Sequence, residues 1–376
     1  MKPEVLVVFG TRPEAIKLAP VVRALRRFFT VRVCATAQHR QMLDQVLRLF
    51  DIVPDYDLDL MRENQNLYDT TARALEGLRP VIEAENPKAV VVQGDTTTTF
   101  AAALAAYYAR IPVAHVEAGL RTGDPYRPFP EEGNRRLTTH LARWHFAPTE
   151  KARENLAREG IPAESTFVTG NPGIDALSWV AERIRSGELR VDWPPGLAGA
   201  FERRNLLLVT GHRRESFGPG FERICRALRT LASRHRDLSV VYPVHLNPNV
   251  REPVFRLLAG VPGIYLTEPL DYAPFVALMQ RADLVLTDSG GIQEEAPALR
   301  KPVLVMREKT ERPEAIEAGV AALVGTDEGR IVEAVGRLLE KGEDYRRMAS
   351  GASPYGDGRA ALRIAEILAR ELGALT

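Results

Sequence analysis

Short apolar runs alternate with longer helical patterns along this chain, and the alternation occurs twice. The first run, residues 4–9 (EVLVVF), ends in Gly10, and residues 89–93 and 205–210 have the same character. Such runs are typical of strands buried on both faces of a parallel sheet, which predicts the α/β fold class. Strands are expected at 4–9, 30–35, 89–93, 113–116, 145–147, 166–168, 205–210, 239–242, 264–266, 284–287, 303–305 and 321–324. Helices are expected at 14–28, 41–50, 67–85 with a break at Pro80, 96–110, from 131 onward, 221–234 and 357–372.

The second series of alternations begins at residue 205, after a joint at residues 171–200. The joint contains Pro194-Pro195-Gly196 and little periodicity, so we interpret it as a linker. A chain of 376 residues suits two domains of ordinary size. The predicted architecture is therefore two doubly wound, Rossmann-like domains that face a cleft.

Composition excludes several classes of protein. Fifty basic and forty-nine acidic side chains leave a net charge of +1, which argues against a general nucleic-acid binder. No apolar run approaches the roughly 20 residues needed to span a bilayer, and residues 1–9 lack a signal-peptide pattern. Cys34 and Cys225 are the only cysteines, and the histidines lack metal-ligand spacing, so neither a disulfide framework nor a metal site is expected. We expect a cytoplasmic protein without a membrane partner.

Glycine, charged and hydroxyl residues follow five of the predicted strands. Ligands of doubly wound sheets bind beyond the carboxyl ends of the strands. Any one of these segments alone is typical of an ordinary turn, but together they predict a ligand-binding cleft. The segments are residues 10–14, 94–96, 117–119, 211–213 and 288–291.

Residues 287–292 (TDSGGI) place hydroxyl and glycine residues between a strand and a helix. This pattern suits phosphate binding at a helix N-terminus, but also an ordinary N-cap formed by Asp288 or Ser289. Glu294 and Glu295 are expected in the first turn of that helix, where a carboxylate can accept hydrogen bonds from a ribose. Neither a Walker motif nor a G-x-G-x-x-G motif is present, which argues against a nicotinamide or flavin enzyme.

Three carboxylates, Asp95, Glu117 and Glu131, lie at or near two adjacent strand ends. Grouped in one cleft they can exchange protons with a substrate, whereas singly each would be an N-cap or a solvated surface group. His212 is a candidate phosphate partner or acid–base group, or else a loop histidine bonded to backbone.

Four basic side chains are candidates for binding a diphosphate, or for ordinary surface ion pairs. They are Arg12, Lys17, Arg213 and Arg312.

Eight segments together resemble the non-hydrolysing bacterial UDP-N-acetylglucosamine 2-epimerases. They occur in order over nearly the whole chain: FGTRPEA at 9–15, TAQHR at 36–40, GDTT at 94–97, HVEAGLRT at 115–122, PEE with NR at 130–135, TGHRRE at 210–215, DSGGIQEE at 288–295 and TERPE at 310–314.

The resemblance implies the glycosyltransferase-B type of fold, with the last helix returning to the first domain. The domains would be 1–170 with 357–376, and 171–356. The implied reaction converts UDP-N-acetylglucosamine reversibly into UDP-N-acetylmannosamine for surface polysaccharide synthesis. It would proceed by anti elimination of UDP to 2-acetamidoglucal and re-addition, in a cytoplasmic homodimer without a cofactor.

The resemblance also assigns residues. The catalytic centre would contain Asp95, Glu117, Glu131, His212, Lys17 and Arg135. The substrate and its UDP would contact Arg12, Lys17, Asp95, Glu117, His212, Leu270, Phe275, Ser289, Gly290, Gly291, Glu295 and Arg312, with Glu295 on the ribose and Phe275 beside uracil. Some relatives bind a second UDP-N-acetylglucosamine as an activator, and the matching residues are Gln38, His39, Gln41, Arg213 and His245.

Three other functions are compatible with the same residues. A UDP-sugar glycosyltransferase would share the diphosphate site and need an acceptor groove. A hydrolysing relative would release free N-acetylmannosamine, and a nucleotide-sugar sensor would bind without turnover. Incubation with UDP-N-acetylglucosamine alone distinguishes these functions.

Overall fold

The computed structural model describes residues 2–36, 40–60, 62 and 65–375. The chain forms two compact units. Unit 1 comprises Met1–Ser178 and Tyr355–Thr376, and unit 2 comprises Trp179–Pro354. The chain therefore leaves unit 1 after Ser178 and returns to it at Tyr355.

Unit 1 is built on a seven-stranded parallel sheet with the order β3-β2-β1-β4-β5-β6-β7. Val5 pairs with Val31 on one side and with Ala89 on the other, so the strand order reverses between β1 and β4. The strands are β1 (Glu4–Phe9), β2 (Thr30–Ala35), β3 (Tyr56–Asp57), β4 (Ala89–Gln93), β5 (Val113–Val116), β6 (Trp144–Ala147) and β7 (Thr166–Val168).

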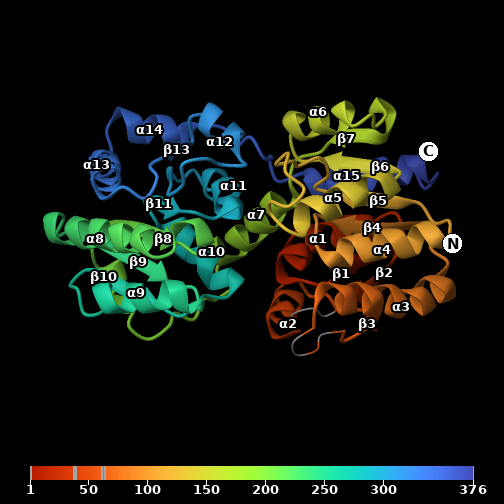
Figure 1. Ribbon diagram of the computed structural model, residues 1–376, viewed down its shortest axis with the longest axis horizontal. Coiled ribbons are helices and arrows are strands. Elements are labelled where there is room, and N and C mark those ends of the chain that lie inside the picture. Colours follow the sequence, from red (N-terminus) through yellow and green to blue (C-terminus); the bar gives the residue numbers. More distant parts are fainter. Residues whose placement is uncertain (1, 37–39, 61, 63–64, 376) are drawn as a thin grey trace. The chain divides into compact units, whose positions relative to one another are not determined.

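Helices flank this sheet, and the C-terminal helix α15 contacts α1 (Figure 1). Asp175 fixes the start of α15, because its two carboxylate oxygens accept hydrogen bonds from the N–H groups of Ala360 (3.1 Å) and Ala361 (2.8 Å). The helices are α1 (Arg12–Leu25), α2 (Arg40–Leu49), α3 (Leu67–Glu85), α4 (Thr97–Tyr108), α5 (Glu131–Leu141), α6 (Glu150–Arg158), α7 (Pro172–Arg185), which runs on into unit 2, and α15 (Ala360–Glu371).

Unit 2 repeats the arrangement with a six-stranded parallel sheet of order β10-β9-β8-β11-β12-β13. Its strands are β8 (Asn205–Thr210), β9 (Leu238–Pro243), β10 (Ile264–Thr267), β11 (Leu284–Thr287), β12 (Val303–Val305) and β13 (Ala321–Leu323). Its helices are α8 (Pro219–Arg234), α9 (Pro248–Leu258), α10 (Tyr272–Arg281), α11 (Gly290–Ala298), α12 (Pro313–Glu317), α13 (Glu328–Leu339) and α14 (Glu343–Ser350).

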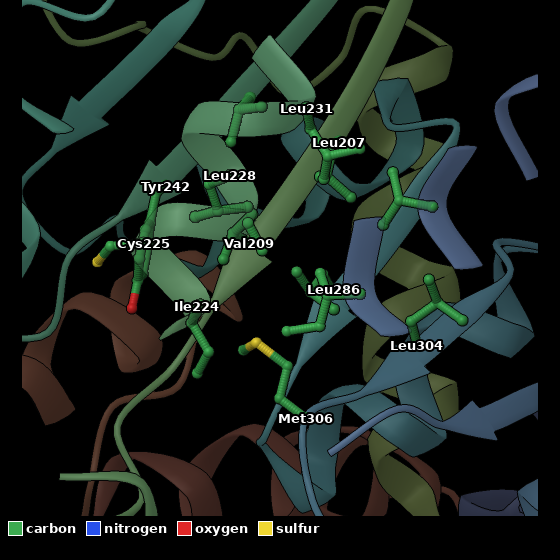
Figure 2. Packing of buried hydrophobic residues seen from close by; sticks show 14 of the residues in the cluster. Leu207, Val209, Ile224, Cys225, Leu228, Leu231, Tyr242, Leu286, Leu304 and Met306 are labelled. Atoms are coloured by element: carbon green, nitrogen blue, oxygen red, sulfur yellow. The ribbon is translucent and has the colours of Figure 1, made fainter. Parts of the chain in front are cut away.

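The core of unit 2 lies between the sheet and the helices that cover it. Figure 2 shows Ile224 and Leu228 of α8 directed toward strand side chains such as Val209 and Leu286, and all four are fully buried. Cys225 lies in the same core, and burial raises the pKa of its thiol to about 12, which makes it an inert apolar residue.

The two doubly wound parallel sheets confirm the predicted fold class. Two local predictions are wrong. Helix α3 continues through Pro80, because this residue is exposed and water can solvate the carbonyl group that it leaves without a donor. The predicted linker at 171–200 contains the fourteen-residue helix α7, which Pro172 begins and which buries Ile174 and Leu177.

No helix within the described residues combines the length and the apolar character needed to cross a membrane.

Candidate functional site

Two points in the fold gather the predicted strand-end residues. The strand order reverses between β1 and β4 in unit 1, and between β8 and β11 in unit 2. Ligands of doubly wound sheets bind beyond the carboxyl ends of such strands. In unit 1 the loops and helix starts at this point contain residues 10–12 and 94–96, and in unit 2 they contain residues 211–213 and 288–291.

Glu117 follows β5, and three side chains donate hydrogen bonds to its carboxylate. Lys17 Nζ on α1 donates to its Oε1 and Oε2 at 2.6 and 2.7 Å. Gln93 Nε2 donates to Oε2, and Asn171 Nδ2 donates to Oε1 at 3.1 Å. The Glu117 side chain is only 5% exposed, and its backbone φ of 61° lies in the left-handed region. A non-glycine residue held there costs conformational energy, a feature that clusters at functional sites.

Asp95 follows β4 and forms an ion pair with Arg135 of α5. Arg135 Nε lies 3.1 Å from Asp95 Oδ2, and its Nη2 donates to the same oxygen. Asn134 Nδ2 donates to the Asp95 carbonyl oxygen at 3.0 Å, so the start of α5 is attached to this loop. Glu131 lies one helical turn before Arg135, on the same face of α5. Its half-buried carboxylate forms no ion pair or hydrogen bond with any residue that the structure describes.

Glu14 ties the loop after β1 to the loop after β4. Its carboxylate is fully buried and accepts hydrogen bonds from the Thr11 N–H at 2.8 Å and the Thr96 hydroxyl at 2.8 Å. Burial raises the pKa of Glu14 above its usual value. The first of these loops leads directly to Arg12, which begins α1 and is half-buried, and the second contains Asp95.

His115 of β5 lies beneath the same loops. It is completely buried, and its Nε2 is 2.7 Å from the Gly94 carbonyl oxygen. Burial lowers the pKa of His115 to about 3, so the ring is neutral and donates through Nε2. The imidazole therefore fixes the backbone immediately before Asp95.

In unit 2, Asp288 after β11 holds the loop after β8. Its fully buried carboxylate accepts hydrogen bonds through Oδ2 from the N–H groups of His212 (2.8 Å) and Arg213 (2.9 Å). The His212 ring lies over the His245 ring, with centroids 5.5 Å apart. Burial lowers the pKa of His212, against the opposing charge of Asp288, so the imidazole favours its neutral form.

The start of α11 presents two backbone donors, the N–H groups of Gly290 and Gly291, that have no acceptor within the described residues, whereas the Ser289 N–H donates to Thr287 Oγ1 at 2.9 Å. Ser289 is the N-cap of α11, and no side chain in the described part of the chain caps this terminus. Asp288 is turned toward the loop after β8 instead, so the alternative of an ordinary side-chain N-cap is wrong. Because α11 begins at Gly290, Glu294 and Glu295 lie in its second turn, and their predicted place in the first turn is also wrong. Free N–H groups at a helix start suit an anion.

Arginine and glutamate side chains surround this helix start. A Cβ atom on Gly290 would lie 3.1 Å from Glu311 Oε1, 3.7 Å from Arg213 Nη2 and 3.9 Å from Arg312 Nη2. Arg213 pairs with Glu311 at 3.2 Å, and Arg312 Nε donates to Glu294. Burial raises the pKa of Glu311, but the neighbouring arginines outweigh it and lower the value overall. The backbone at Gly290 therefore lies beside two guanidinium groups already oriented by carboxylates.

The remaining predicted ligand residues of unit 2 lie on or beside α10 and α11. Phe275 is on α10 and Leu270 precedes it, and both are half-buried. Glu295 on α11 is half-buried. The pKa of Tyr272 is raised well above its usual value, first by burial of Tyr272 and second by the negative charge of Glu295. Glu295 therefore lies near the start of α10.

Of the predicted activator residues, Gln38 and His39 lie outside the described residues, as does the side chain of Gln41. Arg213 contacts Glu311, and exposed His245 accepts a hydrogen bond through Nδ1 from the Asn247 N–H at 3.1 Å.

Sequence reasoning missed three residues that hold the candidate groups, Gln93, Asn171 and Glu311, and it placed Asp288 at a strand end without its role of holding the loop after β8. Gln93 is the last residue of β4 and Asp288 directly follows β11, so their strand-end positions were the available signal. Across the described ranges, no three His, Cys, Asp or Glu side chains are grouped so that they could hold a metal ion.

The model of the UDP-N-acetylglucosamine 2-epimerase family matches residues 23–369. The chain is 60% identical to a UDP-N-acetylglucosamine 2-epimerase of Yersinia pestis, an alignment that covers 97% of this chain and 98% of that protein. The enzyme of Escherichia coli K12 is 58% identical over the same shares of the two chains.

Solved structures agree with these relatives. The Neisseria meningitidis UDP-GlcNAc 2-epimerase bound to UDP-GlcNAc superposes with a TM-score of 0.88 at 48% identity, over 98% of this chain and 100% of that one. The Methanocaldococcus jannaschii enzyme in complex with UDP-GlcNAc and UDP gives 0.80 at 33% identity, over 98% and 99%.

Proposed function

The chain belongs to the UDP-N-acetylglucosamine 2-epimerase family, and from this premise we propose that it interconverts UDP-N-acetylglucosamine and UDP-N-acetylmannosamine. The observation that carries the proposal is the carboxylate of Glu117, which three donors hold in a strained backbone position at the end of β5. Such an arrangement fixes the geometry of one acid–base group with a nearby positive charge.

The reaction has to move a hydrogen at sugar carbon 2, which is not adjacent to a carbonyl group. Direct deprotonation would leave an unstabilised carbanion. We therefore propose an anti elimination: a base removes the proton from carbon 2, the double bond between carbons 1 and 2 forms, and the bond from carbon 1 to UDP breaks with its electron pair leaving on UDP. UDP then adds back to 2-acetamidoglucal while a proton is delivered to the opposite face of carbon 2.

Proton transfer on two faces requires more than one acid–base group, and unit 1 has three candidates. We assign Asp95, Glu117 and Glu131 to this task. Lys17 and Arg135 are already paired with two of these carboxylates and would offset the negative charge that builds up as the proton and UDP move. Arg12 at the start of α1 would add positive charge for the phosphates.

Unit 2 would bind UDP. The uncapped N–H groups of Gly290 and Gly291 suit the diphosphate, together with the Ser289 hydroxyl, His212 and Arg312. Glu295 would accept hydrogen bonds from the ribose hydroxyls, and Phe275 with Leu270 would line the uracil site. These assignments need no resident cofactor, and we place the enzyme in the cytoplasm as a homodimer without nucleic-acid or membrane partners.

Incubation of the purified protein with UDP-N-acetylglucosamine alone tests the proposal. We expect UDP-N-acetylmannosamine to form without any acceptor. Free N-acetylmannosamine would indicate hydrolysis instead. No turnover would indicate either a glycosyltransferase that lacks its acceptor or a nucleotide-sugar sensor. Calorimetry distinguishes these two: binding of the nucleotide sugar without turnover in the presence of any acceptor would favour the sensor.

Two variants provide the internal comparison. Glu117→Gln should lose most of the turnover. Glu159→Gln is the control. The Glu159 carboxylate also pairs with a positive side chain, at 2.7 Å from Arg121 Nη2, but Glu159 lies at the end of α6 and does not follow a strand of the sheet. Equal losses in both variants would show that the loss reflects damage to the fold and not chemistry at Glu117.

A further inference from the structure

Asn171 joins Glu117 to the segment in which the chain returns to unit 1. It lies between β7 and α7 and is 1% exposed. Its side-chain Nδ2 donates to Glu117 Oε1 at 3.1 Å, and its backbone N–H donates to the Tyr355 carbonyl oxygen at 2.7 Å. Tyr355 is the first residue of unit 1 after the chain leaves unit 2.

The orientation of the Asn171 amide follows from its second contact. The Gly173 N–H at the start of α7 lies 2.9 Å from Asn171 Oδ1, and an N–H group requires an acceptor. The amide oxygen therefore faces Gly173 and the NH₂ group faces Glu117. The side chain has one orientation that satisfies both neighbours.

The backbone around Asn171 leaves little room for displacement. A Cβ atom on Gly170 would lie 3.3 Å from Gly356 Cα, and one on Gly356 would lie 3.4 Å from the Asn171 nitrogen. Both glycines have positive φ values, 87° and 141°, that other residues rarely adopt. The two chain segments are thus in close backbone contact directly behind the Asn171 side chain.

Several groups surround the Glu117 carboxylate. Lys17 on α1 is the charged partner, His115 on β5 is neutral at physiological pH because burial lowers its pKa to about 3, and Asp95 follows the neighbouring strand β4. The Lys17 ammonium contacts both carboxylate oxygens and acts as a compact charge, so it does not select the plane of the carboxylate. Two amides do: Gln93 at Oε2 and Asn171 at Oε1.

We propose that Asn171 is a positioning residue for the epimerisation, which holds the Glu117 carboxylate in the orientation and protonation state that proton transfer requires and ties it to the returning segment at Tyr355. The inference rests on the proposed function and adds a residue to it. Asn171 acts through Glu117 and is assigned no contact with the substrate.

Asn171→Asp separates the two contacts of this side chain. Aspartate keeps an oxygen for the Gly173 N–H, but it loses the donor to Glu117 and places a second negative charge about 3 Å away. Like charges at this separation raise the pKa of a carboxylate by about one unit or more. The limb of the kcat–pH profile that Glu117 sets should therefore move to higher pH by about one unit, whether Glu117 acts as acid or as base. We expect kcat to fall about tenfold at its optimum and KM to change less than about twofold.

Asn171→Ser and Thr169→Val complete the experiment. Serine also offers the Gly173 N–H an acceptor and carries no charge, so the same limb should move in the same direction by less, and this variant provides the test if the aspartate variant does not fold. Thr169 lies two residues before Asn171, and its buried hydroxyl donates to the Gly170 carbonyl oxygen at 3.2 Å. Thr169→Val removes this hydroxyl and should leave the profile unchanged.

Each result has a defined meaning. A shifted limb in the Asn171 variants, with wild-type behaviour of Thr169→Val, supports the inference. An active wild type whose limb is unmoved in both Asn171 variants, whatever their melting temperatures, overturns the inference and leaves the proposed function intact. A wild type that forms no epimer overturns the proposed function, and the inference with it.

Discussion

Replacement of Lys17 by methionine should destabilise unit 1 through the carboxylate it leaves behind. Lys17 Nζ lies 2.6 and 2.7 Å from the two oxygens of Glu117, whose side chain is 5% exposed. At an effective dielectric constant of about 20, two unit charges about 4 Å apart attract each other by about 4 kcal/mol. Part of this attraction is offset by the cost of dehydrating the pair, so we expect a coupling free energy of about 2 kcal/mol.

The single variants should be unequal. Lys17→Met leaves a buried carboxylate with only amide donors, and we expect a loss of about 3 kcal/mol. Glu117→Gln leaves an ammonium whose side chain is 23% exposed and can reach water, so its loss should be about 1 kcal/mol. The double variant should lose about 2 kcal/mol, less than the sum of the two.

Urea unfolding followed by tryptophan fluorescence measures these free energies for unit 1 alone. Of the three tryptophans, Trp144 lies in unit 1, and Trp179 and Trp193 lie in unit 2. Replacing the latter two by phenylalanine leaves one buried reporter in the unit that contains the ion pair. Variants whose losses simply add, with a coupling below about 0.5 kcal/mol, would refute the argument that Lys17 compensates a buried charge.

Four further outcomes are expected. Asp95→Asn, Glu117→Gln and Glu131→Gln should each lower kcat by roughly 10²–10⁴-fold while each variant stays folded at the assay temperature. Steady-state kinetics with UDP-N-acetylglucosamine measure the loss, and a wild-type kcat in any one variant would show that its carboxylate is dispensable. UDP at about 100 times its dissociation constant should stabilise the protein by roughly 2.7 kcal/mol. Asp288→Asn disturbs the backbone donors of the loop after β8 and should weaken UDP binding about tenfold in calorimetry. An unchanged affinity would show that Asp288 does not support the UDP site. Burial raises the pKa of Asp175 to about 6, so the stability that its protonated carboxyl group contributes is full below its unfolded pKa near 4 and is lost as pH rises through 6. Relative to Asp175→Asn, the free energy of unfolding of the wild type should fall by about 2 kcal/mol between pH 4 and 8. A difference in urea unfolding that does not depend on pH would contradict this.

The sheets were predictable because parallel strands buried on both faces leave a continuous apolar signal. Residues 4–9, 30–35, 89–93 and 205–210 have that signal and form β1, β2, β4 and β8 with the predicted bounds. Strand β3 was missed because it contains only Tyr56 and Asp57 at the sheet edge, where no apolar run is required.

Helix α7 was missed because Pro194-Pro195-Gly196, a pattern typical of a turn, and an apparent lack of periodicity led us to interpret the whole joint at 171–200 as a linker. Proline is equally suited to the first turn of a helix, and the buried side chains that follow at Ile174, Leu177 and Val180 recur at helical spacing. A proline therefore has to be weighed with the apolar spacing after it.

The candidate groups were easier to predict than the residues that hold them. Glu117 stands directly after a strand, where the fold class places ligands. Its partner Asn171 lies 54 positions further along the chain and Gln93 lies 24 positions before it. Contacts over such separations depend on the order of strands in the sheet, which local sequence patterns do not encode.

The most direct test of the proposed chemistry is proton NMR of UDP-N-acetylglucosamine incubated with the protein alone in D₂O. Elimination and re-addition require that the proton at carbon 2 exchange with solvent through the protein's acid–base groups. The account predicts UDP-N-acetylmannosamine that contains deuterium at carbon 2, with no loss of UDP from the sugar at equilibrium. An epimer that retains its original proton at carbon 2, or a mixture of UDP and free sugar, would contradict it.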